Sequence, residues 1–165
     1  MATLPQSNPA LVRRSDVVEV LLVEDDDGLL DLFSLALDHE GFHVKTASSV
    51  SAAWRQLARK TPDALLLDNG LPDGAGLELC RRIRVTSTLS GLFVAILTAD
   101  TAVVEKSPWL EAGADTCWPK PISTSRLAAL LNGELRSRAR PTQAVVALAA
   151  ESRLDKARRR IVSSN

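Results

Sequence analysis

Four polar stretches of the chain each follow an apolar run, and their side chains could together carry chemistry. They are the acidic run Glu24–Asp27, Asp68 after three leucines, Thr98 after Leu97, and Lys120 between two prolines. Carboxylates held close together repel one another unless a cation lies between them, and oxygen ligands without a nearby His or Cys suit a hard ion such as Mg²⁺. A lysine and a hydroxyl beside that ion would bind the oxygens of a phosphoryl group, with Asp68 as the nucleophile.

The apolar runs that precede these stretches predict buried β-strands. We expect five strands, at Val17–Val23, Phe42–Ala47, Ala64–Leu67, Leu92–Leu97 and Thr116–Trp118. Strands that are apolar throughout, rather than alternating, must be covered on both faces. The pattern therefore favours a parallel sheet between two layers of helices.

Helical periodicity fills the stretches between the strands. The clearest case places five residues on one helical face, which predicts that Trp54 is a core residue: Val50, Ala53, Trp54, Leu57 and Ala58. Five strands alternating with five helices predict an α/β fold, a flavodoxin-like, doubly wound, five-stranded parallel sheet of order 2-1-3-4-5 flanked by five helices. In that topology the polar stretches meet at the carboxyl edge of the sheet, where ligands bind.

The length of 165 residues suits one domain with tails, and 45% hydrophobic and 24% charged residues are typical of a globular protein. We expect a flexible arm over residues 1–16, one folded domain over 17–136, and a basic helical tail over 137–165. Within the tail, five residues have coiled-coil spacing: Ala147, Ala150, Leu154, Ala157 and Ile161. A frayed or docked helix is the plainer interpretation of the tail, with self-association or contact with nucleic acid as alternatives. The tail is too short for a helix-turn-helix with its own core.

The charge distribution and the remaining composition exclude several classes of protein. The 20 basic and 20 acidic residues balance, but acidic residues are in excess before residue 132 and basic residues after it. An acidic body argues against binding nucleic acid over its whole surface. The longest apolar run, Ala144–Ala150, is far shorter than a membrane span, and no export signal follows Met1. Cys80 and Cys117 form neither a disulfide framework nor a metal-binding spacing, so we expect a cytoplasmic protein.

Taken in order along the chain, these motifs resemble the receiver domain of two-component response regulators. Any one of them alone would be a weak signal, but here several occur in the order and at the spacing of the family. The resemblance covers residues 17 to about 135. The stretches that carry it are Val20–Asp26, Leu65–Gly74, Ile96–Ala99, Glu111–Asp115 and Pro119–Pro121.

The resemblance implies a role for each polar stretch. Asp68 would be the phosphoacceptor, Thr98 would contact the phosphoryl group, and Lys120 would form an ion pair with it. Mg²⁺ would be the cofactor, held by the side chains of Asp25 and Asp68, by the carbonyl of Gly70 and, through water, by Glu24. The family also implies a cis peptide bond between Lys120 and Pro121.

The sequence departs from the family pattern at three places. Cys117 stands where the family usually has Tyr or Phe, so the usual relay from the threonine to an aromatic ring is in doubt, and Trp118 is a candidate replacement. Asn69 and Gly70 replace bulkier residues after the phosphoacceptor and could admit water. Pro108 lies inside the fourth expected helix, Thr101–Ala112, and would end or kink it.

The expected function is that of a two-component response regulator receiver. It would take a phosphoryl group from a sensor histidine kinase or a His-phosphotransfer protein and signal through a downstream protein target, with homodimerisation possible. We expect neither an enzyme acting on an external substrate nor a partner that is nucleic acid or membrane. A receiver-like interaction module that works without phosphorylation is an alternative. A phosphomonoester hydrolase is a further one, against which Gly70 stands where a general acid would be needed.

Overall fold

The computed structural model describes residues 17–139 of the chain. The expected arm over residues 1–16 and the tail beyond Ala139, with its coiled-coil pattern, lie outside the described residues. The chain divides into two units, Met1–Ser125 and Arg126–Asn165. The sheet and its surrounding helices belong to the first unit and are described first.

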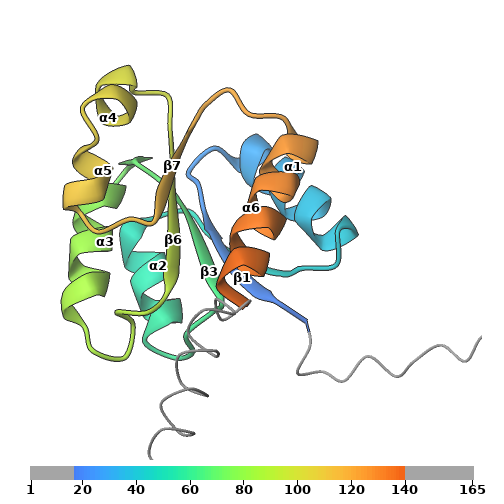
Figure 1. The fold of residues 1–165 in the computed structure, drawn as a ribbon, viewed down its shortest axis with the longest axis horizontal. Helices are drawn as coiled ribbons and strands as arrows, with labels where there is room; N and C mark the ends of the chain where they lie inside the picture. Colours follow the sequence, from blue (N-terminus) through green and yellow to red (C-terminus); the bar gives the residue numbers. More distant parts are fainter. Residues whose placement is uncertain (1–16, 140–165) are drawn as a thin grey trace, which may run out of the picture. The chain divides into compact units, whose positions relative to one another are not determined.

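A five-stranded parallel sheet forms the centre of the first unit (Figure 1). Its strands are β1 (Glu19–Val23), β2 (His43–Ala47), β3 (Ala64–Asp68), β6 (Phe93–Thr98) and β7 (Thr116–Pro119). They lie in the order β2-β1-β3-β6-β7, which confirms the predicted order 2-1-3-4-5. Every residue of β3 and β6 is buried, as expected of the inner strands of a covered sheet.

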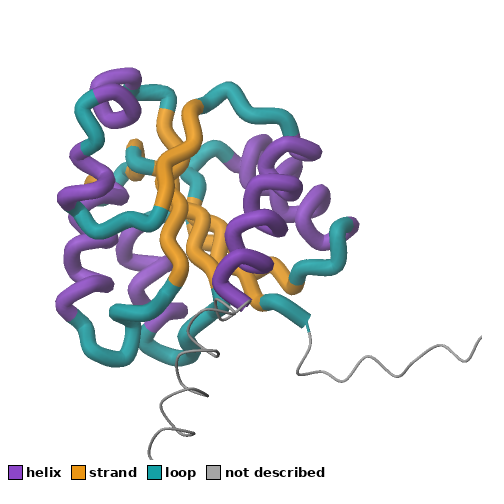
Figure 2. Tube along the Cα trace, viewed as in Figure 1, coloured by secondary structure: helices purple, strands orange, loops and turns teal. Residues whose placement is uncertain are grey.

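Helices cover both faces of the sheet (Figures 1 and 2). On one face lies α1 (Asp27–His39), and on the other lie α2 (Val50–Leu57) and α3 (Gly76–Val85). Side chains alternate between the two faces along each strand. Leu65 and Leu67 of β3 therefore belong to the core cluster shared with α2 and α3, while Leu66 points to the opposite face.

The fourth expected helix is interrupted where the sequence predicts a break. It consists of α4 (Thr101–Glu105) and α5 (Pro108–Glu111), joined through Ser107, whose φ of 56° is left-handed. Pro108 has no N–H to donate to the carbonyl of Val104, so one helix cannot continue through it. The described residues accordingly contain six helices instead of the five expected.

A small antiparallel ribbon was not predicted. It pairs β4 (Gly70–Leu71) with β5 (Gly74–Ala75) in the loop between β3 and α3. Strands of two residues carry no periodic pattern, which is why the sequence did not indicate them. The ribbon begins two residues after Asp68, so its position affects the surroundings of that side chain.

Trp54 is less deeply buried than predicted. Its ring packs against the core cluster but remains partly exposed, and the guanidinium carbon of Arg82 lies 3.6 Å from the centre of the ring. The indole therefore provides a surface on which α3 rests against α2, in the manner of a cation–π contact.

The second unit is described by α6 (Thr124–Ala139), which begins just before it. Leu127, Ala128 and Leu131 of this helix are buried. The helix continues beyond residue 136, the expected end of the folded domain. No helix among residues 17–139 is long and apolar enough to cross a membrane.

Candidate functional site

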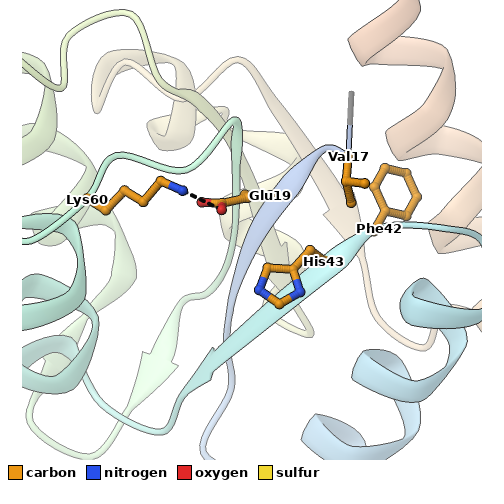
Figure 3. A pocket seen from close by; sticks show the side chains of 5 residues that line it. All are labelled: Val17, Glu19, Phe42, His43 and Lys60. Carbon is orange, nitrogen blue, oxygen red and sulfur yellow. Dashed lines mark hydrogen bonds and ion pairs between the residues drawn. The ribbon is translucent and has the colours of Figure 1, made fainter. Parts of the chain in front are cut away.

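A cavity of about 580 Å³ lies at the amino ends of β1 and β2, far along the sheet from the predicted site residues (Figure 3). It is lined by Val17, Glu19, Phe42, His43 and Lys60. Glu19 and Lys60 form an exposed ion pair of 2.5 Å there, and the hydrogen bond from Lys60 lowers the pKa of Glu19. None of the polar residues that the sequence singled out lines this cavity.

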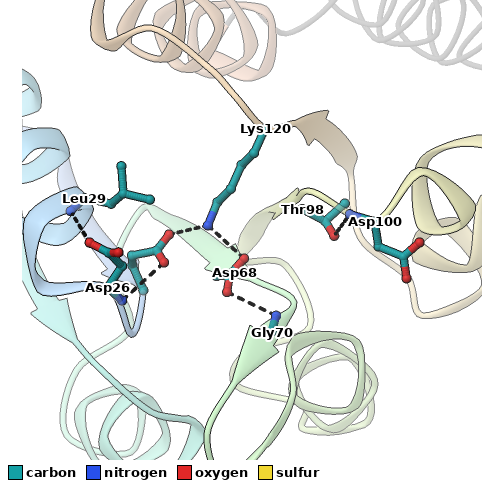
Figure 4. A network of polar contacts seen from close by, with 8 residues as sticks. Asp26, Leu29, Asp68, Gly70, Thr98, Asp100 and Lys120 are labelled. Atoms are coloured by element: carbon teal, nitrogen blue, oxygen red, sulfur yellow. Dashed lines mark hydrogen bonds and ion pairs between the residues drawn. The ribbon is translucent and has the colours of Figure 1, made fainter.

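The predicted site residues gather instead at the carboxyl edge of the sheet (Figure 4). Glu24 directly follows β1, Asp68 ends β3, Thr98 ends β6, and Lys120 directly follows β7. Because these four strands are neighbours in the sheet, their ends bring together residues that are far apart in the sequence. Glu24, Asp68 and Thr98 are at most 6% exposed.

Lys120 joins the two buried carboxylates. Its Nζ lies 2.5 Å from Oε2 of Glu24 and 3.0 Å from Oδ1 of Asp68. Buried charges are costly unless they are paired, so this lysine and these carboxylates depend on one another. The peptide bond from Lys120 to Pro121 is cis, as the family resemblance implied.

The surroundings of Lys120 have opposing effects on its pKa. Burial lowers it, because a charged ammonium loses hydration. The hydrogen bonds and the negative charges of Glu24 and Asp68 raise it, and together they prevail. The net pKa lies above the ordinary value, so Lys120 is a permanent cation at neutral pH.

One oxygen each from Glu24, Asp25 and Asp68 lies within 4.8 Å of the other two. Asp25 is exposed, so the cluster opens to solvent on its side. Three carboxylate oxygens without a nitrogen or sulfur donor form a set that suits Mg²⁺, which binds oxygen and keeps several waters. The residues present therefore fit the ion that the sequence predicted.

Gly70 contacts the side chain of Asp68 through its backbone. Its N–H donates to Oδ2 of Asp68 at 3.1 Å, and a Cβ at this position would lie 3.5 Å from the same oxygen. The two oxygens of Asp68 thus have separate partners, Lys120 for Oδ1 and Gly70 for Oδ2. That the carbonyl of Gly70 binds a metal stays a prediction.

Thr98 lies on the strand next to Asp68. Its hydroxyl accepts a hydrogen bond of 3.1 Å from the N–H of Asp100, and its carbonyl accepts one of 2.8 Å from the N–H of Lys120. The side chain is therefore engaged with the loop that leads into α4, whose first turn Asp100 caps. Its contact with a phosphoryl group stays a prediction.

Asn69 and Asp73, in the loop that follows Asp68, have roles that the sequence analysis did not identify. The Oδ1 atom of Asn69 accepts from the N–H of Leu77 at 3.2 Å, at the start of α3. The carboxylate of Asp73 accepts from the N–H groups of Val50 and Ser51, at the start of α2. A Pro-Asp-Gly sequence is a turn signal, but sequence alone does not say which distant helix an aspartate in a turn will cap.

Cys117, at the position where the family usually has an aromatic residue, and its neighbour Trp118 point to opposite faces of the sheet. Cys117 is half-buried and packs against the same core cluster as Trp109 of α5, and burial raises the pKa of its thiol. Trp118 is buried but is not part of that cluster, as alternation along β7 requires. Within the described residues, the buried Nε1 of Trp109 has no hydrogen-bond partner. Trp109 therefore packs against the same core cluster as Cys117, and Trp118 lies on the other face of β7.

Comparison with known proteins gives consistent matches. Residues 20–132 match the response regulator receiver domain family. The chain is 36% identical over 132 residues to the response regulator MprA of Mycobacterium leprae, which covers 80% of this chain and 57% of that protein. It is 38% identical over 127 residues to the probable transcriptional regulatory protein TcrX of Mycobacterium tuberculosis, covering 76% of this chain and 53% of that protein. The chain thus spans about half the length of these relatives.

Solved structures give the same result for the fold. A putative response regulator from Chloroflexus aurantiacus superposes with a TM-score of 0.68 at 32% identity, covering 73% of this chain and 98% of that one. The non-phosphorylated HemR receiver domain from Leptospira biflexa has a TM-score of 0.65 at 30% identity, covering 72% and 94%. Both matches are to proteins of a single functional class.

Proposed function

This chain belongs to the response regulator receiver domain family, and from that premise we propose that Asp68 accepts a phosphoryl group. The donor is the phosphohistidine of a sensor histidine kinase or of a His-phosphotransfer protein. The observation that carries the proposal is the single ammonium of Lys120 shared between Glu24 and Asp68, beside three clustered carboxylate oxygens. Such a site has its negative oxygens paired and oriented before a phosphoryl group arrives.

The reaction is an in-line displacement at phosphorus. An oxygen of Asp68 attacks, the bond between phosphorus and the histidine nitrogen breaks, and the nitrogen takes a proton as neutral imidazole leaves. The product is an acyl phosphate on Asp68. Lys120 already touches Oδ1 of this residue, so its charge is placed to offset the charge on the transferred oxygens. The hydroxyl of Thr98, which accepts from the N–H of Asp100, can donate its own hydrogen to a phosphoryl oxygen.

Asp25, Asp68, the carbonyl of Gly70 and, through water, Glu24 would hold Mg²⁺. When bound, this ion supplies positive charge that stabilises the phosphoryl oxygens during transfer. The N–H of Gly70 donates a hydrogen bond to Oδ2 of Asp68. This bond limits rotation of the carboxylate and so orients Asp68 for its attack on phosphorus. We therefore propose one covalent event on the chain's own aspartate, without turnover of an external substrate.

A cytoplasmic protein that signals to a downstream protein, with homodimerisation as an option, is the setting we propose. Relatives are named as transcriptional regulators, but this chain spans about half of their length. The described residues hold no helix-turn-helix that would read DNA, so nucleic acid is not the partner we propose for them.

A receiver-like module that works without phosphate is the second candidate. One observation favours it: Cys117, a small thiol, stands at the position where the family usually has an aromatic residue. In that case partner binding would be the same in the wild type and in an Asp68→Asn variant.

The direct test is incubation with acetyl phosphate and Mg²⁺. We expect acid-labile phosphate on the wild type, little on Asp68→Ala, and a normal amount on Asp31→Asn, which removes an exposed carboxylate from α1. Equal labelling of the wild type and Asp68→Ala, or no labelling of the wild type, would overturn the proposal.

A further inference from the structure

The ribbon that follows Asp68 is fixed at its base by hydrogen bonds around the phosphoacceptor. The N–H of Gly70 holds Oδ2 of Asp68 at 3.1 Å, and the N–H of Gly76 donates to the carbonyl of Asn69 at 3.0 Å. The strands β4 and β5 then pair up to the turn that contains Asp73. Whatever moves the tip of this ribbon therefore acts on Gly70 and, through it, on the orientation of Asp68.

The tip of the ribbon is tied to a different helix. Oδ1 of Asp73 accepts from the N–H of Val50 at 2.7 Å, and Oδ2 accepts from the N–H of Ser51 at 2.9 Å. Ser49 caps the same helix from within its own segment, where its hydroxyl accepts from the N–H of Ala52 at 3.1 Å. Two side chains thus satisfy the first three N–H groups of α2, and one of the two comes from the ribbon.

The electrostatics of this tie are favourable. A carboxylate at a helix N-terminus faces the positive end of the helix dipole. Hydrogen bonds from the side chain and the backbone of Ser51 lower the pKa of Asp73, so that it is charged at neutral pH. Asp73 is nevertheless exposed and contributes nothing to the hydrophobic core.

The helix that Asp73 holds is itself anchored. Ala53 and Leu57 of α2 are buried in the core cluster, and Trp54 lies under the guanidinium of Arg82 on α3. Because α2 is fixed against the sheet and α3, it can serve as a support for the tip of the ribbon.

We propose that Asp73 is a positioning residue for the Asp68 site, because it ties the ribbon to α2 and thereby fixes the backbone of Gly70. The proposal rests on the proposed function, in which the N–H of Gly70 orients Asp68 and its carbonyl is a metal ligand. Loss of the tie frees the tip, loosens Gly70 and weakens binding of the divalent cation. Asp73 itself touches neither the cation nor the phosphoryl group.

The chain offers a matched control for this idea. Asp73→Ala and Ser49→Ala each remove a cap from the first turn of α2, but only the first releases the ribbon. An effect that comes from a weaker helix must appear in both variants. An effect that comes from the ribbon must appear in Asp73→Ala alone.

The experiment is a titration of the nitrogen-15-labelled chain of 165 residues with Mg²⁺ alone, followed through the backbone amide signals, including that of Gly70. We expect Asp73→Ala to raise the midpoint about tenfold, at the lower end of effects from residues behind metal ligands. Ser49→Ala should leave the midpoint close to that of the wild type. Asp73→Asn, which keeps an acceptor oxygen without the charge, should recover part of the affinity.

Each outcome decides the matter. Equal midpoints for Asp73→Ala and the wild type, or equal increases for Asp73→Ala and Ser49→Ala, would overturn the positioning role. If Asp73→Ala does not fold, Asp73→Asn is compared with Ser49→Ala by the same criterion. Failure of the wild type itself to bind Mg²⁺ and to gain phosphate from acetyl phosphate would instead sink the proposed function.

Discussion

Lys120 and Glu24 are 96 positions apart in the sequence, yet the Nζ of one lies 2.5 Å from Oε2 of the other. Asp68 is the second partner of the same ammonium, at 3.0 Å. The three side chains come from the ends of three different strands, so their contact depends on the sheet being assembled in its correct order.

Replacing Lys120 with Met should destabilise the protein and abolish phosphorylation. The substitution leaves the buried carboxylates of Glu24 and Asp68 without their cation, which we expect to lower the free energy of unfolding by about 2–4 kcal/mol. Urea unfolding without Mg²⁺ measures the loss, and labelling by acetyl phosphate measures the activity. Lys106→Met, at the exposed end of α4, is the control and should change neither quantity. A Lys120→Met protein of wild-type stability would contradict the prediction.

Replacing Asp25 with Asn should have opposite effects with and without Mg²⁺. In the absence of the ion, the substitution removes one of three clustered carboxylates and relieves repulsion, which we expect to stabilise the fold by about 1 kcal/mol. In its presence, the stabilisation that Mg²⁺ gives the wild type should be largely lost, because a ligand is missing. Thermal unfolding with Mg²⁺ and with EDTA measures both effects. Asp27→Asn, in the first turn of α1, serves as the comparison, and an identical response of the two variants would refute the idea.

The raised pKa of Lys120 predicts how stability changes at alkaline pH. Below the ordinary lysine pKa of 10.5 the ammonium is charged in the folded and the unfolded chain, and its contribution to stability is complete. As the pH rises above 10.5 the unfolded chain loses the proton first, and the contribution declines until the folded pKa is passed. The difference in unfolding free energy between the wild type and Lys120→Met should therefore stay constant up to about pH 10 and shrink as the pH rises above 10.5. A difference that stays constant would show that the lysine does not carry a raised pKa.

Ser107 offers a test of the interrupted helix. Its φ of 56° is left-handed, a conformation that costs a residue with a Cβ about 1 kcal/mol and costs glycine almost nothing. Ser107→Gly should leave the protein as stable or slightly more stable, whereas Ser107→Val should destabilise it by about 1–2 kcal/mol. Thermal unfolding distinguishes the two. Equal stability of both variants would mean that the turn between α4 and α5 is not held in this conformation.

The main sheet could be predicted from the sequence because its inner strands are uninterrupted apolar runs. Ala64–Leu67 and Leu92–Leu97 are apolar at every position. A strand without polar residues on either face has to be covered on both faces of the sheet, so it is expected at the centre of the fold. The structure extends each of them by one polar residue, Asp68 and Thr98. The residues that carry chemistry thus follow from where the apolar runs end.

The loop after Asp68 could not be predicted in the same way. The hydrogen bonds that Asp73 accepts from the N–H groups of Val50 and Ser51 join segments more than 20 positions apart, and nothing in the local sequence specifies that pairing. The role of Trp118 could not be predicted for a different reason. It depends on the face of β7 to which the ring points, and that face is set only once the register of the strand is known.

Gly76 begins α3 close to the end of β3, and a Cβ built there would lie 2.3 Å from the backbone oxygen of Asp68. No side chain, not even a methyl group, can be accepted without pushing the first turn of α3 away from the end of β3. A library randomised at this codon and selected for folded protein should therefore return glycine alone. Position 76 is therefore unsuitable for a labelling or cross-linking residue. A glycine at the equivalent position of a distant homologue would indicate that its third helix also begins this close to the end of its third strand.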